Sequence, residues 1–375
     1  MGVAQRSRRW LVPVTTVAVV AGVGALGPVV ADASPKLPTI TAQDLLAKVQ
    51  TAKVDGLSGT VRSNADLGLP SIPGMAPGSR ELTDLLGGQH TARVAFASPD
   101  KAKVSLIDNQ AEQLWTTDGK SAWAYDSSKR EATKLTLPAH KTTKPEKALP
   151  ESYDPQAVAK QFLDAIDPTT AVQVSGTEKV AGRDAYKLRL VPKTDKTTVG
   201  SVTLAIDSKT WVPLDVTVMP RTGNDPAVEL GFTSVSFDVP SASSFTFTPP
   251  KGVKVTDQKA PATREHPRSV PPELVKPVKP AKPGAAQADK PTIIGTGWDS
   301  VAMIRGANTA GLASNPAAGP LAQLLGKAPT VQGSWGKGKV LTTKMVSALI
   351  TDDGRVFVGL VTPDTLQAAA AKAPR

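Results

Sequence analysis

The side chains with the most catalytic potential in this sequence are three histidines, His90, His140 and His266. Imidazoles serve acid–base chemistry or metal binding when a carboxylate or a second ligand stands at a suitable spacing. His90 and His140 lie in loop-like polar contexts, no histidine pair has metal-ligand spacing, and no Gly-x-Ser-x-Gly sequence supplies a hydrolase nucleophile. The carboxylates also lack the apolar surroundings that would raise their pKa for acid–base work. We therefore predict a protein that is not an enzyme, with no catalytic residue, no metal site and no cofactor.

Residues 333–339 match the Gly-x-x-x-x-Gly-Lys spacing of a phosphate-binding loop. Val340 stands where such a loop carries the hydroxyl that binds magnesium, and the residues after it alternate as in a strand. Phosphate binding would require the N-terminus of a helix at that point. We interpret the segment as a glycine-rich turn between two strands.

Composition narrows the classes of protein further. The 375 residues include no cysteine, which excludes disulfides, thiolate metal sites and a lipidated N-terminal cysteine. The formal net charge is +11. A basic surface suits anionic lipid headgroups or wall polymers, or it serves only solubility, and the sequence leaves these alternatives open.

The N-terminus has the pattern of an export signal. Three arginines within the first nine residues precede a nearly uncharged run over residues 11–30, and Ala-Asp-Ala follows at residues 31–33. This pattern predicts a signal segment, residues 1–33, with a mature chain from Ser34 in the cell envelope or outside the cell. Nucleic acid is then not an expected partner. The alternative is an uncleaved membrane anchor, since about 20 residues suffice to cross a bilayer.

The chain from residue 34 to 256 is expected to form one mainly β domain. Thr41 can cap a helix over residues 41–54, and apolar residues alternate with polar ones through most of residues 57–255. A second helix is predicted over residues 154–166, where Asp154 precedes a proline and three apolar residues share one face.

A linker and a small α+β unit are predicted to follow. Residues 257–291 are rich in proline and lysine, a composition that favours extended chain without a core. Residues 292–375 form the second unit. Its expected strands are 331–335, 340–350 and 355–361, and its expected helices are 317–327 and 365–372. Residues 352–354 would form a hairpin turn between the last two strands.

Four segments resemble one family, and they occur in the order found in that family. They are residues 118–126, 181–190, 205–214 and 245–253, and the first reads Asp-Gly-Lys-Ser-Ala-Trp-Ala-Tyr-Asp. Over residues 40–255 the chain resembles LolA-like lipoprotein carriers and the N-terminal domain of MucB/RseB regulators. The resemblance implies a curved antiparallel half-barrel closed by helices, with 245–253 as the closing strand and an apolar concave face that takes acyl chains. The basic residue that gates release in the carriers has no clear counterpart here.

Strand alternation selects candidate residues for that apolar face. The candidates are Trp115, Trp123, Leu188, Leu190, Leu204, Ile206, Leu214, Val216, Leu230 and Phe232. The alternation shows which residues of one strand share a face, but it does not show which face of the sheet is concave. A sheet face that is only part of an ordinary core would show the same alternation. We expect glutamate at Leu188 or Leu204 to weaken fatty-acid binding steeply and to leave the fold intact. A long apolar insertion between residues 61 and 94 is either a lid or an ordinary hairpin insertion.

Two functions follow from the resemblance. The first is a carrier or sensor outside the cytoplasm that binds lipid or lipoprotein acyl chains. The alternative is a regulatory protein that binds the outer part of a membrane anti-sigma factor. The partner would thus be an acyl chain or a membrane protein, an anti-sigma factor or a transporter.

Overall fold

A computed structural model describes residues 34–68, 87–108, 111–137, 168–259, 291–305 and 325–374. The predicted signal segment, the predicted helix 154–166, and the greater parts of the insertion, the linker and the predicted helix 317–327 lie outside these ranges. Within the described ranges, every helix falls short of the length and hydropathy that crossing a membrane requires.

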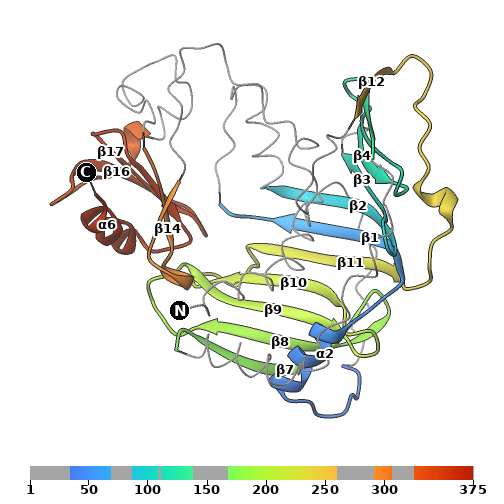
Figure 1. Cartoon of the computed structure of the whole chain (residues 1–375). Helices are drawn as coiled ribbons and strands as arrows, with labels where there is room; N and C mark the ends of the chain where they lie inside the picture. The colour runs from blue at the N-terminus through green and yellow to red at the C-terminus, as the bar shows by residue number, and fades with distance from the viewer. Residues whose placement is uncertain are drawn as a thin grey trace, which may run out of the picture.

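One sheet of 12 strands forms the larger part of the molecule (Figure 1). Its strands are β1 (Gly56–Ala65), β2 (Gly88–Ala97), β3 (Lys101–Asp108), β4 (Ala111–Thr117), β5 (Ser121–Asp126), β6 (Glu131–Thr136), β7 (Thr170–Val180), β8 (Arg183–Pro192), β9 (Val199–Asp207), β10 (Pro213–Pro220), β11 (Val228–Ser236) and β12 (Lys254–Lys259). They are ordered β12-β6-β5-β4-β3-β2-β1-β11-β10-β9-β8-β7. Neighbouring strands are antiparallel except β12 and β6, which are parallel. The predicted mainly β class, with a large curved sheet and a small second unit, is confirmed.

The family-like segments build the turns of this sheet. At the β4–β5 turn, Asp118 Oδ1 accepts hydrogen bonds from the backbone N–H groups of Lys120 and Ser121, at 2.9 and 2.7 Å. At the β7–β8 turn, Ala181 and Gly182 both have positive φ, as a type I′ hairpin requires. The backbone geometry of these two turns thus accounts for the presence of Asp118 and Gly182 in the family-like segments.

An ion pair joins the second of these segments to the third. Arg183 Nε lies 2.6 Å from Asp207 Oδ1, and Asp207 Oδ2 accepts a bond from the backbone N–H of Thr210 at 2.6 Å. Burial raises the pKa of Asp207, but the hydrogen bonds from Arg183 and Thr210 outweigh it and hold this pKa below its ordinary value. The pair therefore fixes the start of β8 against the turn that follows β9.

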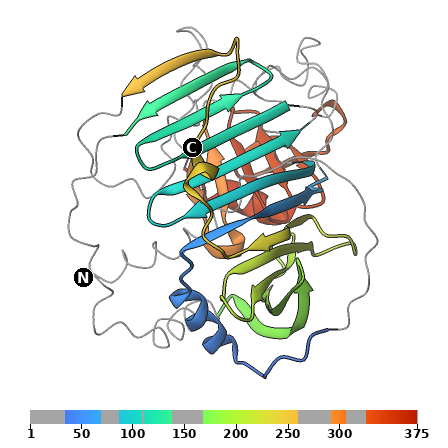
Figure 2. The ribbon, with the colours of Figure 1, turned by 90° about the vertical axis from the view of Figure 1, so that its right-hand side faces the viewer.

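The closing segment differs from its prediction. Residues 245–253 were expected as a strand, but the chain forms the short 3₁₀ helix η2 (Ala242–Phe245) and then no strand until β12. Thr116 Oγ1 donates a hydrogen bond to the Phe245 carbonyl, so this stretch lies across β4. Figure 2 shows it crossing the outer surface of the sheet. Strand β12 itself extends to Lys259, three residues beyond the predicted domain end at 256.

Helix α2 (Ala42–Thr51) covers one end of the sheet. Thr41 caps it as predicted, because its side chain accepts a hydrogen bond from the Asp44 N–H at 3.0 Å. Its apolar face contributes Leu45 and Leu46 to a core with Leu188 and Ile206 of β8 and β9. The helix ends three residues before the predicted residue 54.

Within the described residues, the second unit has a sheet of six strands with helix α6 packed against it. Its elements are β13 (Thr292–Ile294), η3 (Gly297–Asp299), β14 (Val301–Ile304), β15 (Thr330–Gly333), β16 (Gly336–Thr342), β17 (Ser347–Thr351), β18 (Val356–Gly359) and α6 (Pro363–Lys372). The strand order is β13-β14-β18-β17-β16-β15. The prediction of one strand over 340–350 is wrong, because Thr343 accepts a hydrogen bond from the Val346 N–H and turns the chain between β16 and β17. The glycine-rich turn between two strands expected at 333–339 is present but shorter, because Gly333 pairs with Gly336 and residues 336–339 already belong to β16.

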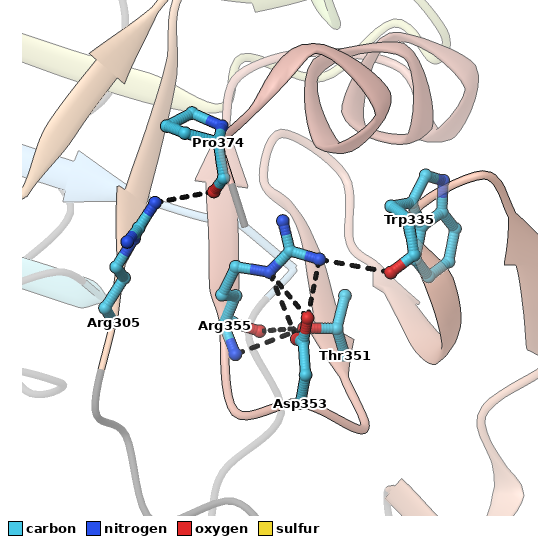
Figure 3. Close-up of polar contacts among 6 residues, drawn as sticks. All are labelled: Arg305, Trp335, Thr351, Asp353, Arg355 and Pro374. Carbon is cyan, nitrogen blue, oxygen red and sulfur yellow. Dashed lines mark hydrogen bonds and ion pairs between the residues drawn. The ribbon is translucent and has the colours of Figure 1, made fainter.

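The hairpin turn predicted at residues 352–354 is also present. Figure 3 shows the guanidinium of Arg355 held between the Asp353 carboxylate and the Trp335 carbonyl, which accepts a bond at 3.1 Å. Arg355 is buried, so the ion pair and this bond both anchor the β17–β18 turn inside the unit.

The two units meet at an apolar joint, which consists of Val199, Ala227 and Met345 with the partly buried residues packed around them. Met345 is 1% exposed. Thr197 forms a β-bridge with Val361 beside the joint, and Lys344 Nζ lies 3.0 Å from Asp66 Oδ2. The joint therefore fixes the small unit at the ends of β9 and β11.

Candidate functional site: the apolar face of the large sheet

A row of aliphatic side chains crosses five neighbouring strands, β7 to β11. Val174 pairs with Leu188, Leu188 with Leu204, Leu204 with Val216, and Val216 with Leu230. Directly paired residues of an antiparallel ladder point to the same side of the sheet. The five side chains therefore form a continuous apolar row.

The same face continues across β1 to β4. Phe232, which shares the parity of Leu230, pairs with Val61, Val61 pairs with Ala92, and Ala92 with Leu106. Trp115 packs against Ala92 and Leu106. We call the side of the large sheet to which these two rows and Trp115 point the apolar face.

The structure places eight of the ten predicted residues on this face. They are Trp115, Leu188, Leu190, Leu204, Ile206, Val216, Leu230 and Phe232. Leu214 is buried at a β-bulge of β10. The prediction for Trp123 is wrong: Trp123 pairs with Thr116, whereas Trp115 pairs with Ala124, so the two tryptophans point to opposite faces. Trp123 instead packs edge-on against Phe247, with ring centroids 5.4 Å apart.

Burial divides the apolar face into two parts. Over β8 and β9, Leu188 is 3% exposed and Ile206 is buried, because α2 packs on them. Over β10 and β11, Val216, Leu230 and Phe232 are half-buried and belong to none of the apolar clusters that the described residues form. The candidate site is therefore the central part of the face, around these three side chains.

A polar pair ends the first row. Ser63 pairs with Leu230 on one side and with His90 on the other, so both side chains share the apolar face. The prediction of a loop for His90 is wrong, because it lies in β2 and is buried. Its Nε2 is 2.6 Å from the Gly87 carbonyl, and its Nδ1 has no hydrogen-bond partner among the described residues.

The opposite face of the large sheet carries Asp215, a carboxylate whose pKa is raised. Asp215 pairs with Gly231, and a Cβ at Gly231 would lie 2.2 Å from Asp215 Oδ2, so only glycine leaves room for the carboxylate. Burial, with smaller contributions from Glu178 and Glu229, raises the pKa of Asp215 from 3.8 to about 6. The prediction that no carboxylate has a raised pKa is thus wrong for Asp215.

We expect Asp215→Asn to stabilise the protein at pH 7 by about 2 kcal/mol, since the uncharged amide removes the cost of burying a charge. The folded pKa lies above the unfolded one, so this cost is absent below pH 4, grows as the pH rises to about 6 and is complete above it. Asparagine can still accept the Thr217 hydroxyl bond, 3.0 Å long in the wild type. Urea unfolding of both proteins from pH 4 to 7 checks this, and parallel pH profiles would contradict it.

Metal binding has no support in the described ranges, where no three His, Asp or Glu side chains gather closely enough to hold an ion. The arrangement offers instead a broad apolar surface with one buried imidazole at its margin. Such a surface binds without directional bonds and favours apolar ligands.

The solved structures similar to this chain include MucB and LolA-superfamily proteins. Pseudomonas aeruginosa MucB, in a complex with MucA, is 14% identical, with 88% of this chain and 96% of that chain covered and a TM-score of 0.41. A LolA-superfamily protein from Nitrosomonas europaea is 13% identical over 56% of this chain and 99% of that chain, with a TM-score of 0.20. Lipoprotein LppX of Mycobacterium tuberculosis is 12% identical over 50% and 93%, with a TM-score of 0.25. The sequence matches no protein-family model and no curated protein.

Proposed function

We propose that this chain is a binding protein outside the cytoplasm, a carrier or sensor, whose apolar face takes the acyl chains of a lipid or lipoprotein. The observation that supports it most is the central part of the apolar face. There Val216, Leu230 and Phe232 belong to the same rows as apolar side chains that are packed in the core. These three side chains nevertheless belong to no apolar cluster of the described residues.

The free energy available on such a surface is sufficient for binding. Burial of alkyl chain gains about 0.8 kcal/mol per CH₂, so a ten-carbon segment gains roughly 8 kcal/mol before ordering costs. A dissociation constant near 1 μM corresponds to about 8 kcal/mol. An acyl chain somewhat longer than this segment therefore leaves room for the entropy lost on binding.

We expect Leu230→Glu to weaken binding of a fluorescent palmitic-acid analogue at least tenfold, because a carboxylate in the central part of the apolar face must be desolvated when the chain binds. Leu230 is half-buried and outside the α2 core, so the fold should survive the change. Fluorescence titration measures the affinity, and the thermal transition monitors the fold.

Ser234→Glu is the matched control, since Ser234 is exposed on the same strand and pairs with Thr60 on the opposite face. Equal affinity of Leu230→Glu and the wild type would refute the proposed site. If the wild type binds no fatty acid, phospholipid or acylated peptide, the proposed function fails. The alternative, a regulatory protein that binds a membrane anti-sigma factor, then takes its place.

A further inference from the structure

The small sheet carries an apolar row that lies outside the candidate site described above. Ile293 pairs with Ala302, Ala302 with Val358, Val358 with Ala348, and Ala348 with Leu341. These five side chains come from five neighbouring strands and point to one side of the sheet. None of them has a hydrogen-bonding group.

A second row runs beside the first on the same face. Ile304 pairs with Val356, and Val356 with Ile350. Both rows follow from strand parity, because Val356 and Val358 are two residues apart in β18 and Ala348 and Ile350 are two apart in β17. We call the surface formed by these two rows the second wall.

The other face of the small sheet already has its cover. Met303, Phe357 and Leu349 point to that side and pack with Leu366 and Ala370 of α6. The second wall, by contrast, contributes no member to any apolar cluster of the described residues, and Ile293 is 61% exposed. A sheet that is apolar on both faces needs an apolar partner on each of them.

The second wall is continuous with the apolar face of the large sheet. Val346 precedes β17 by one residue and has the parity of Ala348, and it packs at the joint with Val202 and Val218. Val202 pairs with Leu190 and with Val218, so both lie on the apolar face. The two faces therefore meet at the joint, where Val346 of the small unit and Val202 and Val218 of the large sheet pack against the same apolar cluster.

The figures show the same relation. In Figure 1, α6 lies on the side of the small sheet that is turned away from β1 and β2. In Figure 2, the small unit lies behind the large sheet, on the side opposite to the stretch that contains η2. Thr116 contacts that stretch and pairs with Trp123, so both point away from the apolar face. The small unit, on the opposite side of the sheet, therefore stands on the side of the apolar face.

We propose that the binding site has two walls, and that acyl chains lie between the apolar face and the second wall, close to the joint. This inference rests on the proposed function. A protein partner would require polar groups in its rim and interior, whereas an alkyl chain requires none. The eight aliphatic side chains of the second wall fit the alkyl chain, and Lys339, which pairs with Ile350, lies at the end of the second row.

The test uses the full-length mature chain and two probes, the fluorescent palmitic-acid analogue and palmitic acid that carries a photoreactive diazirine. Val358→Glu and Val356→Glu each place a carboxylate on the second wall, and we expect each to weaken binding about tenfold. Ala368→Glu is the matched control, because Ala368 is exposed on α6 and should leave the affinity unchanged. Irradiation of the wild type with the photoreactive probe should label peptides from both 57–232 and 341–358.

The outcomes separate the two proposals. If Leu230→Glu loses binding while both second-wall variants bind as the wild type does, and label is confined to 57–232, the proposed function stands and the second wall is overturned. If the wild type binds neither probe, both proposals fail. Should a second-wall variant not fold, the position of the label in the wild type decides alone.

Discussion

Replacing Met345 by glutamate is expected to detach the small unit from the large sheet. Met345 is 1% exposed between Val199 and Ala227, and no cationic group belongs to this apolar cluster. An unpaired carboxylate buried there costs about 3 kcal/mol or more, which exceeds what a few surface contacts can offset. We expect the wild type to unfold in one thermal transition and Met345→Glu in two, and we expect the radius of gyration from small-angle X-ray scattering to be larger for the variant.

Met345→Leu is the control, because a swap that conserves volume and polarity costs little in a packed site. It should keep one transition and the wild-type dimensions. An unchanged radius of gyration for Met345→Glu would show that the hydrogen bonds around Thr197 and Lys344 hold the units together without the apolar joint.

The second large effect is expected at Asp207, which is 1% exposed. Asp207→Ala removes the bidentate contact with Arg183, the hydroxyl bond from Thr210 and the backbone bond from Lys209. Loss of such a buried, paired carboxylate lowers stability by about 3 kcal/mol. The pKa of Asp207 is lowered in the fold, so its contribution is present at neutral pH and disappears as the pH falls through the folded pKa.

Urea unfolding at pH 7 measures the loss, and Asp207→Asn separates its causes. Asparagine keeps an acceptor for the turn but lacks the charge that pairs with Arg183, so its stability should lie between those of the alanine variant and the wild type. Equal stability of the wild type and Asp207→Ala would mean that the turn after β9 holds without this carboxylate.

The sequence predicts the shared faces well within a strand and poorly between strands. Leu188 and Leu190, or Leu204 and Ile206, follow directly from a period of two. Trp115 and Trp123 lie on different strands, and their relation depends on the register across the β4–β5 turn, where a shift of one residue exchanges the faces. Local patterns do not fix that register.

The pattern also does not distinguish a covered row from an uncovered one. Leu188 and Leu230 alternate alike, but α2 docks on the first and not on the second. Glutamate at Leu188, expected from the sequence to affect binding alone, would instead place a charge in the core beneath α2. Leu204 also packs against that cluster, so Leu230 is the better position.

Contacts between distant segments account for the features that were missed. The raised pKa of Asp215 arises from burial beside Gly231 and from Glu178 and Glu229, which belong to other strands. The joint likewise brings Val199, Ala227 and Met345 together across the two units. Neither has a signature in a short stretch of sequence, because each depends on how the sheets pack.

The central place of β1 determines when the large sheet can form. This strand stands between β2 and β11 and is the only link between one half, β2 to β6 with β12, and the other, β7 to β11, among the described strands. Thr60 and Thr233, which are hydrogen-bonded across β1 and β11, are 173 positions apart. Pairing over such sequence separations gives a high contact order, and folding of such β proteins takes on the order of milliseconds to seconds. A chain growing from its N-terminus therefore holds β1 half-paired until β11 has been synthesised, and the sheet closes only after most of the polypeptide is available.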